Sequence, residues 1–341
     1  MTKGIFPMKR EHFANPVVLD SDQLRKTAQN QPADILTGLI REGEQVLLYS
    51  ATGSYKSWLA TAIWLAAANA SEVAKTASGA SKWKAPQCRK VLLIDGELDQ
   101  YDLGDRLNKL CPNYGDASGL VLMRQAQDIN VAFPDLANCD DQIKLIQYCH
   151  DEGVELLILD NLTTLANVAD ENASSAMKPL LDMLLKLKAA GIATVLVHHS
   201  NKGDNGYRGS TALATTFNAI IKLKRDKVEH GLFSLVFEKA RNNHIENQAL
   251  NLRLLNLPDS SCRLEADAEL SKLEVIVSLV RSLDFVDDNS IRAALALKLG
   301  EEVSQPSFSR FKKKAISEGL ISNDDWNKCI KDANELAAIE L

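Results

Sequence analysis

The segment SATGSYKS, from Ser50 to Ser57, has the residue types and spacing that suit phosphate binding. It ends in Lys56 and Ser57, like the pattern GxxxxGK[ST], in which backbone N–H groups at a helix N-terminus surround phosphates, the lysine reaches the outer phosphates and the hydroxyl binds Mg2+. The alternative is a plain strand, turn and helix. The pattern therefore predicts ATP and Mg2+ as ligands, with contacts from Ser50, Ala51, Thr52, Gly53, Ser54, Tyr55, Lys56, Ser57 and Trp58.

The loop departs from its pattern at both flanking glycines. Ser50 and Tyr55 stand in their places, and Gly53 lies between them. A side chain at position 55 must be accommodated where glycine fits freely. If the ring only fills space, Tyr55→Gly should keep ATP binding. A loss of binding would show that the ring has become part of the site.

Three carboxylates follow apolar runs that read as strands. Asp160 ends the run LLILD and could hold the magnesium shell through water, although a lone strand-end aspartate is more often a surface cap. Asp95 and Glu97 follow another strand. Glu97 is our candidate to orient or deprotonate the attacking water, because Asp95 could equally cap a helix starting near Leu98. The alternative is that both are solvated loop carboxylates.

A further apolar run ends in His198 and His199 and continues into a loop from 200 to 210. Adjacent side chains of a strand point to opposite faces, which argues against a shared metal site. One of the two histidines could sense the outer phosphate, and Lys202 and Arg208 of the loop could touch DNA or a neighbouring subunit. A core histidine beside a solvated loop explains the segment equally well.

The segment FEKARNN ends a predicted strand with Lys239 and Arg241 on one face. A fixed guanidinium stabilises charge that develops during phosphoryl transfer, so this pair fits a finger offered to the phosphate of a neighbouring subunit. A solvated edge strand is the alternative.

Apolar strands that alternate with amphipathic helices must position these residues, and they indicate an α/β fold with a mostly parallel sheet covered on both faces. The expected strands are 45–50, 90–96, 120–124, 156–160 and 193–199, followed by 219–225, 232–240 and 250–256 as an antiparallel extension. Residues 72–90 read as an exposed loop or small hairpin. Residues 1–35 form an arm ending in a short helix, residues 36–262 the α/β domain, and 259–268 a connection.

Residues 268–341 read as a small all-α domain. Two helices, 290–299 and 307–321, are joined by a short turn, and the second is basic, as in a helix-turn-helix of the winged-helix kind. The segment EGLI would lead into the wing. A helical bundle for oligomerisation is the alternative. The candidate DNA contacts are Arg310, Lys312, Lys313 and Lys314.

The bulk composition excludes some classes of protein. The 341 residues are 45% hydrophobic and 25% charged, with a net charge of -6, so any nucleic-acid binding must use local basic patches. No apolar run is long enough for a membrane span and no secretory signal is visible, so the cytoplasm is expected. Six cysteines without a CxxC pair argue against zinc knuckles and disulfide frameworks.

The order SATGSYKS, DGE, LILDN, HHSNKG with RGS, and EKARNN resembles the RecA-like ATPases of the plasmid RepA helicase branch, relatives of DnaB and RadA, over about residues 32–256. The resemblance implies a RecA-like fold and a ring-shaped hexamer that hydrolyses ATP between subunits and threads single-stranded DNA through its centre. It implies an ATPase site formed by Lys56, Ser57, Glu97, Asp160, His199 and the trans-acting pair Lys239 and Arg241.

Two functions remain open. The first is a DNA helicase or translocase that serves replication of a plasmid, phage or other mobile element. The second is a nucleotide-dependent DNA-binding regulatory or recombination ATPase that does not unwind DNA. Both use the same ATP site, and DNA-stimulated hydrolysis without strand displacement would favour the second.

Overall fold

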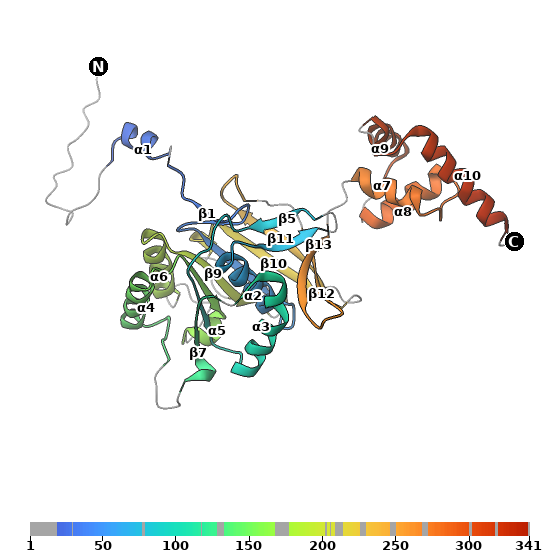
Figure 1. Ribbon diagram of the computed structural model, residues 1–341. Coiled ribbons are helices and arrows are strands. Elements are labelled where there is room, and N and C mark those ends of the chain that lie inside the picture. The colour runs from blue at the N-terminus through green and yellow to red at the C-terminus, as the bar shows by residue number, and fades with distance from the viewer. Residues whose placement is uncertain are drawn as a thin grey trace, which may run out of the picture.

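The computed structural model describes most of the chain, in fourteen segments. They form a large α/β body and, from residue 272 on, a body of helices (Figure 1). The described segments are 19–28, 30–76, 79–116, 118–127, 133–167, 177–201, 203–204, 206–208, 214–225, 230–245, 250–267, 272–299, 302–317 and 320–339.

Six parallel strands form one side of an 11-stranded sheet, out to its edge. In spatial order they are β10 (Ala219–Arg225), β3 (Gln45–Ser50), β9 (Ala193–His199), β8 (Leu156–Asp160), β6 (Val91–Asp95) and β7 (Leu120–Met123). All six residues of β3 are buried, as expected of a strand covered on both faces. The carboxyl ends of these strands meet at one edge of the sheet, where the phosphate loop also begins.

Helices cover both faces of the sheet. On one face, α2 (Lys56–Ala68) and α3 (Gln100–Tyr114) share a core with Val46 and Leu48 of β3. On the other, α4 (Cys139–Asp151), α5 (Leu162–Leu165) and α6 (Lys178–Ala189) share a core with Leu47 and Tyr49. Figure 1 shows α2 beside α3 and α4 beside α6. The predicted RecA-like α/β fold is therefore confirmed.

The sheet continues as an antiparallel extension. β11 (Leu232–Ala240) pairs with β10, and β12 (Leu250–Asn256) pairs with β11, as expected. The expectation of a connection at 259–268 is wrong, because β13 (Cys262–Asp267) pairs with β12 and buries Cys262, Leu264 and Ala266 at alternate positions. The sheet thus extends beyond residue 262.

The segment 72–90 is a hairpin of β4 (Glu72–Thr76) and β5 (Ser81–Lys84), and β4 joins the sheet beside β13. Of the two alternatives expected for this segment, the small hairpin is confirmed and the exposed loop is not, because Val73 and Trp83 are buried. Before the sheet, the chain forms the short helix α1 (Ser21–Thr27), capped by Asp20, and the small strands β1 (Asp34–Leu36) and β2 (Ile40–Arg41).

The body of helices has its own hydrophobic core. It contains α7 (Lys272–Arg281), α8 (Asp288–Leu299), α9 (Gln305–Ser317) and α10 (Asn323–Ile339). The sequence analysis expected the segment EGLI to lead into a wing, but the chain continues into the helix α10, which was not predicted. Glu318 and Gly319 of this segment lie outside the described residues. Within the described ranges, no helix combines the length and the apolar character needed to cross a membrane.

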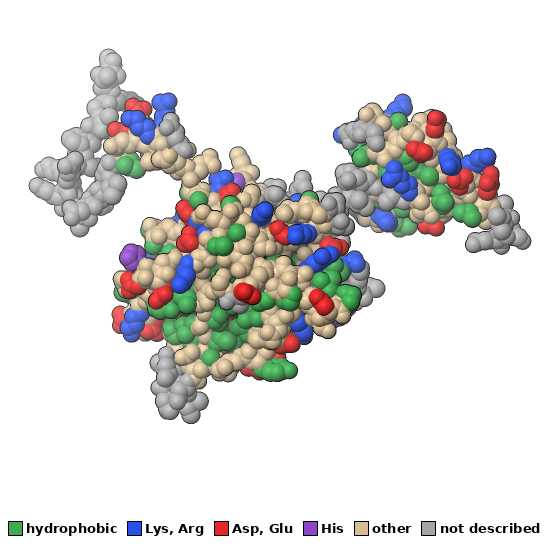
Figure 2. All heavy atoms as spheres, viewed as in Figure 1, with side chains coloured by type: hydrophobic (Ala, Val, Ile, Leu, Met, Phe, Trp, Pro, Cys, Tyr) green, Lys and Arg blue, Asp and Glu red, His purple; other side chains and the backbone are tan. Residues whose placement is uncertain are grey.

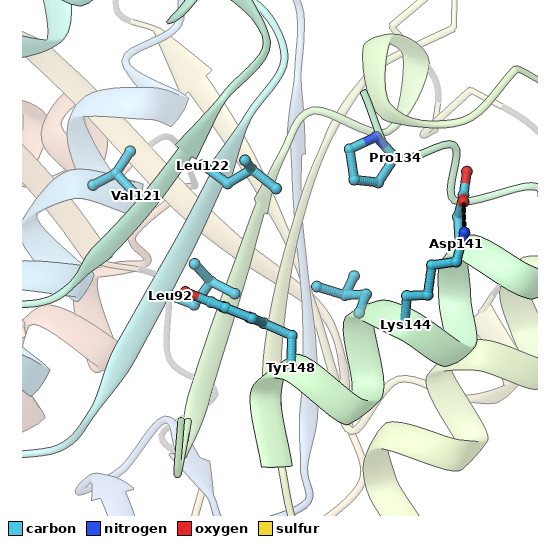
Figure 3. A pocket seen from close by; sticks show the side chains of 8 residues that line it. Leu92, Val121, Leu122, Pro134, Asp141, Lys144 and Tyr148 are labelled. Atoms are coloured by element: carbon cyan, nitrogen blue, oxygen red, sulfur yellow. Dashed lines mark ion pairs between the residues drawn. The ribbon is translucent and has the colours of Figure 1, made fainter. Parts of the chain in front are cut away.

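A hollow of about 410 Å3 lies between α4 and β7, which forms one edge of the described sheet. Hydrophobic side chains gather on this face (Figure 2), and Tyr148 reaches from α4 toward Leu92 on the sheet (Figure 3). The two charged lining residues, Lys144 and Asp141, form an ion pair with each other at 3.6 Å. This apolar hollow lacks phosphate-binding chemistry, which is found in a second hollow at the carboxyl edge of the sheet.

Candidate active site

The predicted phosphate loop is a turn between β3 and the first residue of α2. Two of its residues, Gly53 (φ 76°) and Tyr55 (φ 64°), have left-handed backbone conformations. Tyr55 is the N-cap of α2 and makes no side-chain capping bond. The first backbone N–H groups of a helix lack partners within the helix and favour an anion. The local backbone therefore has the form that phosphate binding needs.

Lys56 lies folded against this loop, and only 7% of it is exposed. Its Nζ donates to the backbone oxygens of Ala51 (2.9 Å) and Ser50 (3.2 Å) and to the Ser50 hydroxyl (3.1 Å). Burial lowers the pKa of Lys56, and the charges of Asp160 and Glu97 oppose that shift. The serine in place of the first glycine thus supplies an extra acceptor for the lysine.

Asp160 ends β8 directly beside Asp95, which ends β6. Asp160 is 4% exposed; burial and then the charge of Asp95 raise the pKa of Asp160 to about 6, while a hydrogen bond with Ser57 opposes the shift. Hard oxygen ligands such as these two side chains are what Mg2+ prefers, and a buried carboxylate gains from sharing a cation. Ser57 and Asp160 therefore fit the predicted Mg2+ site.

Asp95 shapes the turn that presents Glu97. Its Oδ1 accepts hydrogen bonds from the backbone N–H groups of Glu97 (2.8 Å) and Leu98 (2.7 Å). The alternative that Asp95 caps a helix starting near Leu98 is wrong, because α3 begins at Gln100 and its N-cap is Asp99. Of Asp95 and Glu97, only Glu97 lines the hollow.

Asn161, which the sequence analysis missed, connects Glu97 and His199. Its Nδ2 donates to Glu97 Oε2 and lies 3.2 Å from His199 Nε2. Burial lowers the pKa of His199, which favours the neutral ring. The available signal was its place directly after the strand-end Asp160.

The two histidines of β9 have different surroundings, as the alternation of a strand predicts. His198 is fully buried, and its Nε2 lies 2.8 Å from the backbone oxygen of Arg208. Burial lowers the pKa of His198 to about 4. Only His199 lines the hollow beside the phosphate loop.

Arg106, on α3, is a second residue that the sequence analysis missed. Its guanidinium carbon lies 4.9 Å from the centre of the Trp58 ring, and Nε and Nη1 are buried without hydrogen-bond partners in the described part of the chain. Burial lowers the pKa of Arg106, and the charges of Asp160 and Asp95 oppose that shift. Its sequence signal was a charge between Leu103 and Leu110, on the apolar side of an amphipathic helix.

These side chains enclose a polar hollow of about 260 Å3. Of the predicted contacts, Ser50 and Ala51 do not line it and instead hold Lys56. The lining residues are Thr52, Gly53, Ser54, Tyr55, Lys56, Ser57, Trp58, Glu97, Leu98, Arg106, Asp160 and His199.

The predicted pair Lys239 and Arg241 lies away from this hollow. β11 runs antiparallel to β10, and Ala240 pairs with Ala219 at the start of β10, so the pair is at the amino ends of the parallel strands. Lys239 Nζ donates to the backbone oxygen of Ala214, and Arg241 Nη2 to that of Thr215 (2.7 Å). Within one chain, these cations cannot reach the phosphate loop at the opposite edge.

The predicted DNA contacts have different surroundings. Lys202 lies outside the described residues, and Arg208 follows β9 close to His199, to whose backbone oxygen its N–H donates (2.9 Å). On α9, Arg310, Lys313 and Lys314 are exposed.

Lys312 differs from its neighbours on α9. It pairs with Asp288 at 2.8 Å and lies 4.6 Å from the centre of the Trp326 ring, whose Nε1 donates to the same carboxylate (3.0 Å). These contacts join α8, α9 and α10. Lys312 is half-buried and paired with a carboxylate, so it is less available to DNA than its exposed neighbours, and its role as a DNA contact stays a prediction.

Comparison with known proteins gives one family match. The profile of the family described as an AAA domain matches residues 9–205, which include the phosphate loop, Glu97, Asp160 and His199. A search of curated proteins found no match.

Three solved structures are similar to this chain at low identity. The flagellar accessory protein FlaH from Methanocaldococcus jannaschii is 10% identical, with a TM-score of 0.46 over 67% of this chain and 90% of its own. A KaiC-like protein from Pyrococcus horikoshii is 13% identical, with a TM-score of 0.47 over 69% of this chain and 99% of its own. The RadB recombinase is 17% identical, with a TM-score of 0.43 over 67% and 92%.

Proposed function

Because the chain belongs to the family described as an AAA domain, whose members are nucleotide-dependent P-loop ATPases, we propose that it is a DNA helicase or translocase driven by ATP hydrolysis. The observation that carries the proposal is the meeting of Lys56, the Ser57 and Asp160 pair, and Glu97 around one polar hollow. Each of these three groups has a separate task in phosphoryl transfer, and their four residues lie at the same edge of the sheet.

The chain's own residues divide the work as follows. The N-terminus of α2 and Lys56 bind the phosphates, and Ser57 with Asp160 would hold Mg2+, Asp160 through water. When bound, Mg2+ neutralises charge that develops on the phosphate oxygens. Glu97 accepts the proton of the attacking water, and Arg106 supplies a positive charge in cis.

Two contacts of Asn161 support the role of Glu97. Its amide donates to one carboxylate oxygen, Oε2, and leaves the other for a water proton. The same amide lies next to His199, which we propose contacts the outer phosphate. A change at the phosphate can thus reach the general base through one side chain.

We further propose that the chain works as a homo-oligomer, a ring-shaped hexamer of the RepA type. Lys239 and Arg241 lie at the edge of the sheet opposite the phosphate loop, so they can complete only a neighbour's site. Single-stranded DNA in the central pore would contact Lys202 and Arg208, and the element served would be a plasmid, phage or other mobile element in the cytoplasm.

A DNA-binding regulatory or recombination ATPase without unwinding activity is the second candidate. It is favoured by the exposed cations of α9, Arg310, Lys313 and Lys314, on a helix that follows α8 as in a helix-turn-helix. Such a helix suits duplex DNA, which a translocase pore does not require.

An ATPase assay beside a strand-displacement assay separates these functions. The wild-type chain should hydrolyse ATP faster with single-stranded DNA and displace a paired strand, and Lys56→Ala should do neither. Hydrolysis stimulated by DNA without displacement would reject the helicase in favour of the regulatory ATPase. Absence of nucleotide binding by the wild-type chain would reject both.

A further inference from the structure

Tyr55 stands in the phosphate loop where the pattern has glycine, and its ring packs against the start of β11. The rings of Tyr55 and Phe233 stack with centroids 5.4 Å apart and planes 21° apart. The His230 ring meets Tyr55 edge-on at 6.1 Å. Phe233 is fully buried, so the tyrosine rests on a fixed surface of the core.

The hydroxyl of Tyr55 is also held. It accepts a hydrogen bond of 2.9 Å from the backbone N–H of Gly231. Gly231 is itself closely confined, since its φ is 89° and a Cβ there would lie 2.9 Å from the backbone oxygen of Leu254 on β12. The donor therefore has a fixed position, set by the β11–β12 pairing.

A second tie reaches the loop from the last residue of β10. The guanidinium carbon of Arg225 lies 5.7 Å from the centre of the Tyr55 ring, and its Nη1 donates to the backbone oxygen of Gly53 at 3.4 Å. The end of β10 and the start of β11, which pair with each other, thus hold both left-handed residues of the loop.

We propose that Tyr55 is a positioning residue that fastens the phosphate loop to the β10–β11 ends and so keeps the loop in its binding conformation; the proposal rests on the proposed nucleotide site. A left-handed tyrosine is strained where glycine is not, and such strain persists only when surrounding contacts over-determine it. Glycine would relieve the strain but leave the loop to be ordered when nucleotide binds. Tyr55 thus restricts the backbone of the loop and keeps it ordered before nucleotide binds.

The competing explanation is that the ring touches the nucleotide directly. A substitution at Phe233 distinguishes the two explanations, because Phe233 contacts Tyr55 but does not line the hollow. If Tyr55 acts by holding the loop, then loosening its support at Phe233 must weaken nucleotide binding as well. If the ring is a nucleotide contact, Phe233→Leu leaves binding nearly unchanged.

The experiment is a titration with a fluorescent ATP analogue, with ATPase kinetics and a thermal unfolding curve for each variant in the absence of nucleotide. The variants are Tyr55→Phe, Tyr55→Gly, Phe233→Leu and the double variant Tyr55→Gly with Phe233→Leu. Tyr101→Phe is the matched control, because Tyr101 is 81% exposed on α3. Lys56→Ala tests the underlying nucleotide site.

We expect Kd to rise about fivefold in Tyr55→Phe, the size of one lost hydrogen bond, and tenfold or more in Tyr55→Gly. KM should follow Kd while kcat at saturating ATP stays near wild type. Phe233→Leu should raise Kd severalfold but add little in the double variant, because its effect passes through Tyr55.

Three results overturn the proposal: unchanged Kd in both Tyr55 variants, unchanged Kd in Phe233→Leu alone, or fully additive effects in the double variant. A variant that melts below the assay temperature is replaced by Arg225→Gln, which loosens the second tie and should raise Kd about threefold. If Lys56→Ala binds the analogue as tightly as the wild-type chain, the nucleotide site itself is wrong, and that result is distinct from a failure of Tyr55.

Discussion

Arg106→Gln removes the positive charge that faces two strand-end carboxylates of the candidate active site. In the wild-type chain, burial and the charge of Asp95 raise the pKa of Asp160 to about 6, against the opposing charge of Arg106. At pH 7, about nine-tenths of Asp160 is then ionised. A nearby opposite charge lowers an acid's pKa, so without Arg106 we expect the pKa of Asp160 to rise further and a smaller part of Asp160 to be ionised at pH 7.

The measurement is kcat/KM for ATP hydrolysis between about pH 5 and 9, because this ratio reports the ionisation of the free enzyme. The acid limb should move up by about 1 pH unit in Arg106→Gln and stay in place in Arg106→Lys, which keeps the charge. Lys109→Gln removes a charge from the same helix outside the hollow, where Lys109 pairs with Asp105, and should leave the limb unmoved.

The rate that remains at high pH separates a second effect of the same change. Where Asp160 is fully ionised in both proteins, any residual loss measures the phosphate interaction of Arg106 itself. An equal loss of rate at every pH, with the acid limb unmoved, would refute the electrostatic link between Arg106 and Asp160.

Other substitutions test the candidate site and the helical body. Asp160→Asn should raise the free energy of unfolding by about 2 kcal/mol at pH 8 but little at pH 4. Burial raises the pKa of Asp160, so ionisation of its carboxylate destabilises the wild-type fold as the pH rises from about 4 to about 6. Urea unfolding at both pH values measures this, and equal gains at the two pH values would contradict it. Asn161→Ala should lower kcat about tenfold with KM nearly unchanged in steady-state kinetics, because Glu97 loses a charge-assisted hydrogen bond; a change confined to KM would count against it. Lys312→Ala should lower the stability of the helical body by about 1 kcal/mol in thermal unfolding. Lys313 is exposed, and Lys313→Ala should instead reduce the salt dependence of DNA binding by about one phosphate contact. The reverse pattern would contradict both assignments.

The strands were predictable because burial on both faces demands uninterrupted apolar runs. The bounds of β3, β8 and β9 agree with the sequence analysis to the residue. β13 was missed because CRLEAD alternates small or apolar residues with charged ones, over six residues beside a turn, and such a segment resembles a connection until its pairing with β12 is known. The pairing with β12 therefore determines that these six residues form a strand.

The site was only partly predictable. Lys56 and Asp160 carry local patterns, whereas Asn161 and Arg106 owe their importance to neighbours from other elements. Asn161 meets Glu97 from a different strand, and Arg106 reaches the hollow from α3. The partner of Lys312 could not be predicted either, because a basic helix shows its charge in the sequence but not the carboxylate that pairs with it.

The phosphate loop and the pair Lys239 and Arg241 lie at opposite edges of the sheet, so each chain has two different ends. A six-residue strand such as β3 separates the two ends by about 20 Å. A contact between the Lys239 and Arg241 end of one chain and the phosphate loop of the next is head-to-tail. In an open row of such chains, the phosphate loop at one end has no neighbour. If Lys239 and Arg241 complete a neighbour's site as proposed, only a closed ring completes every site, and a substitution that blocks closure would inactivate some sites while leaving their residues intact.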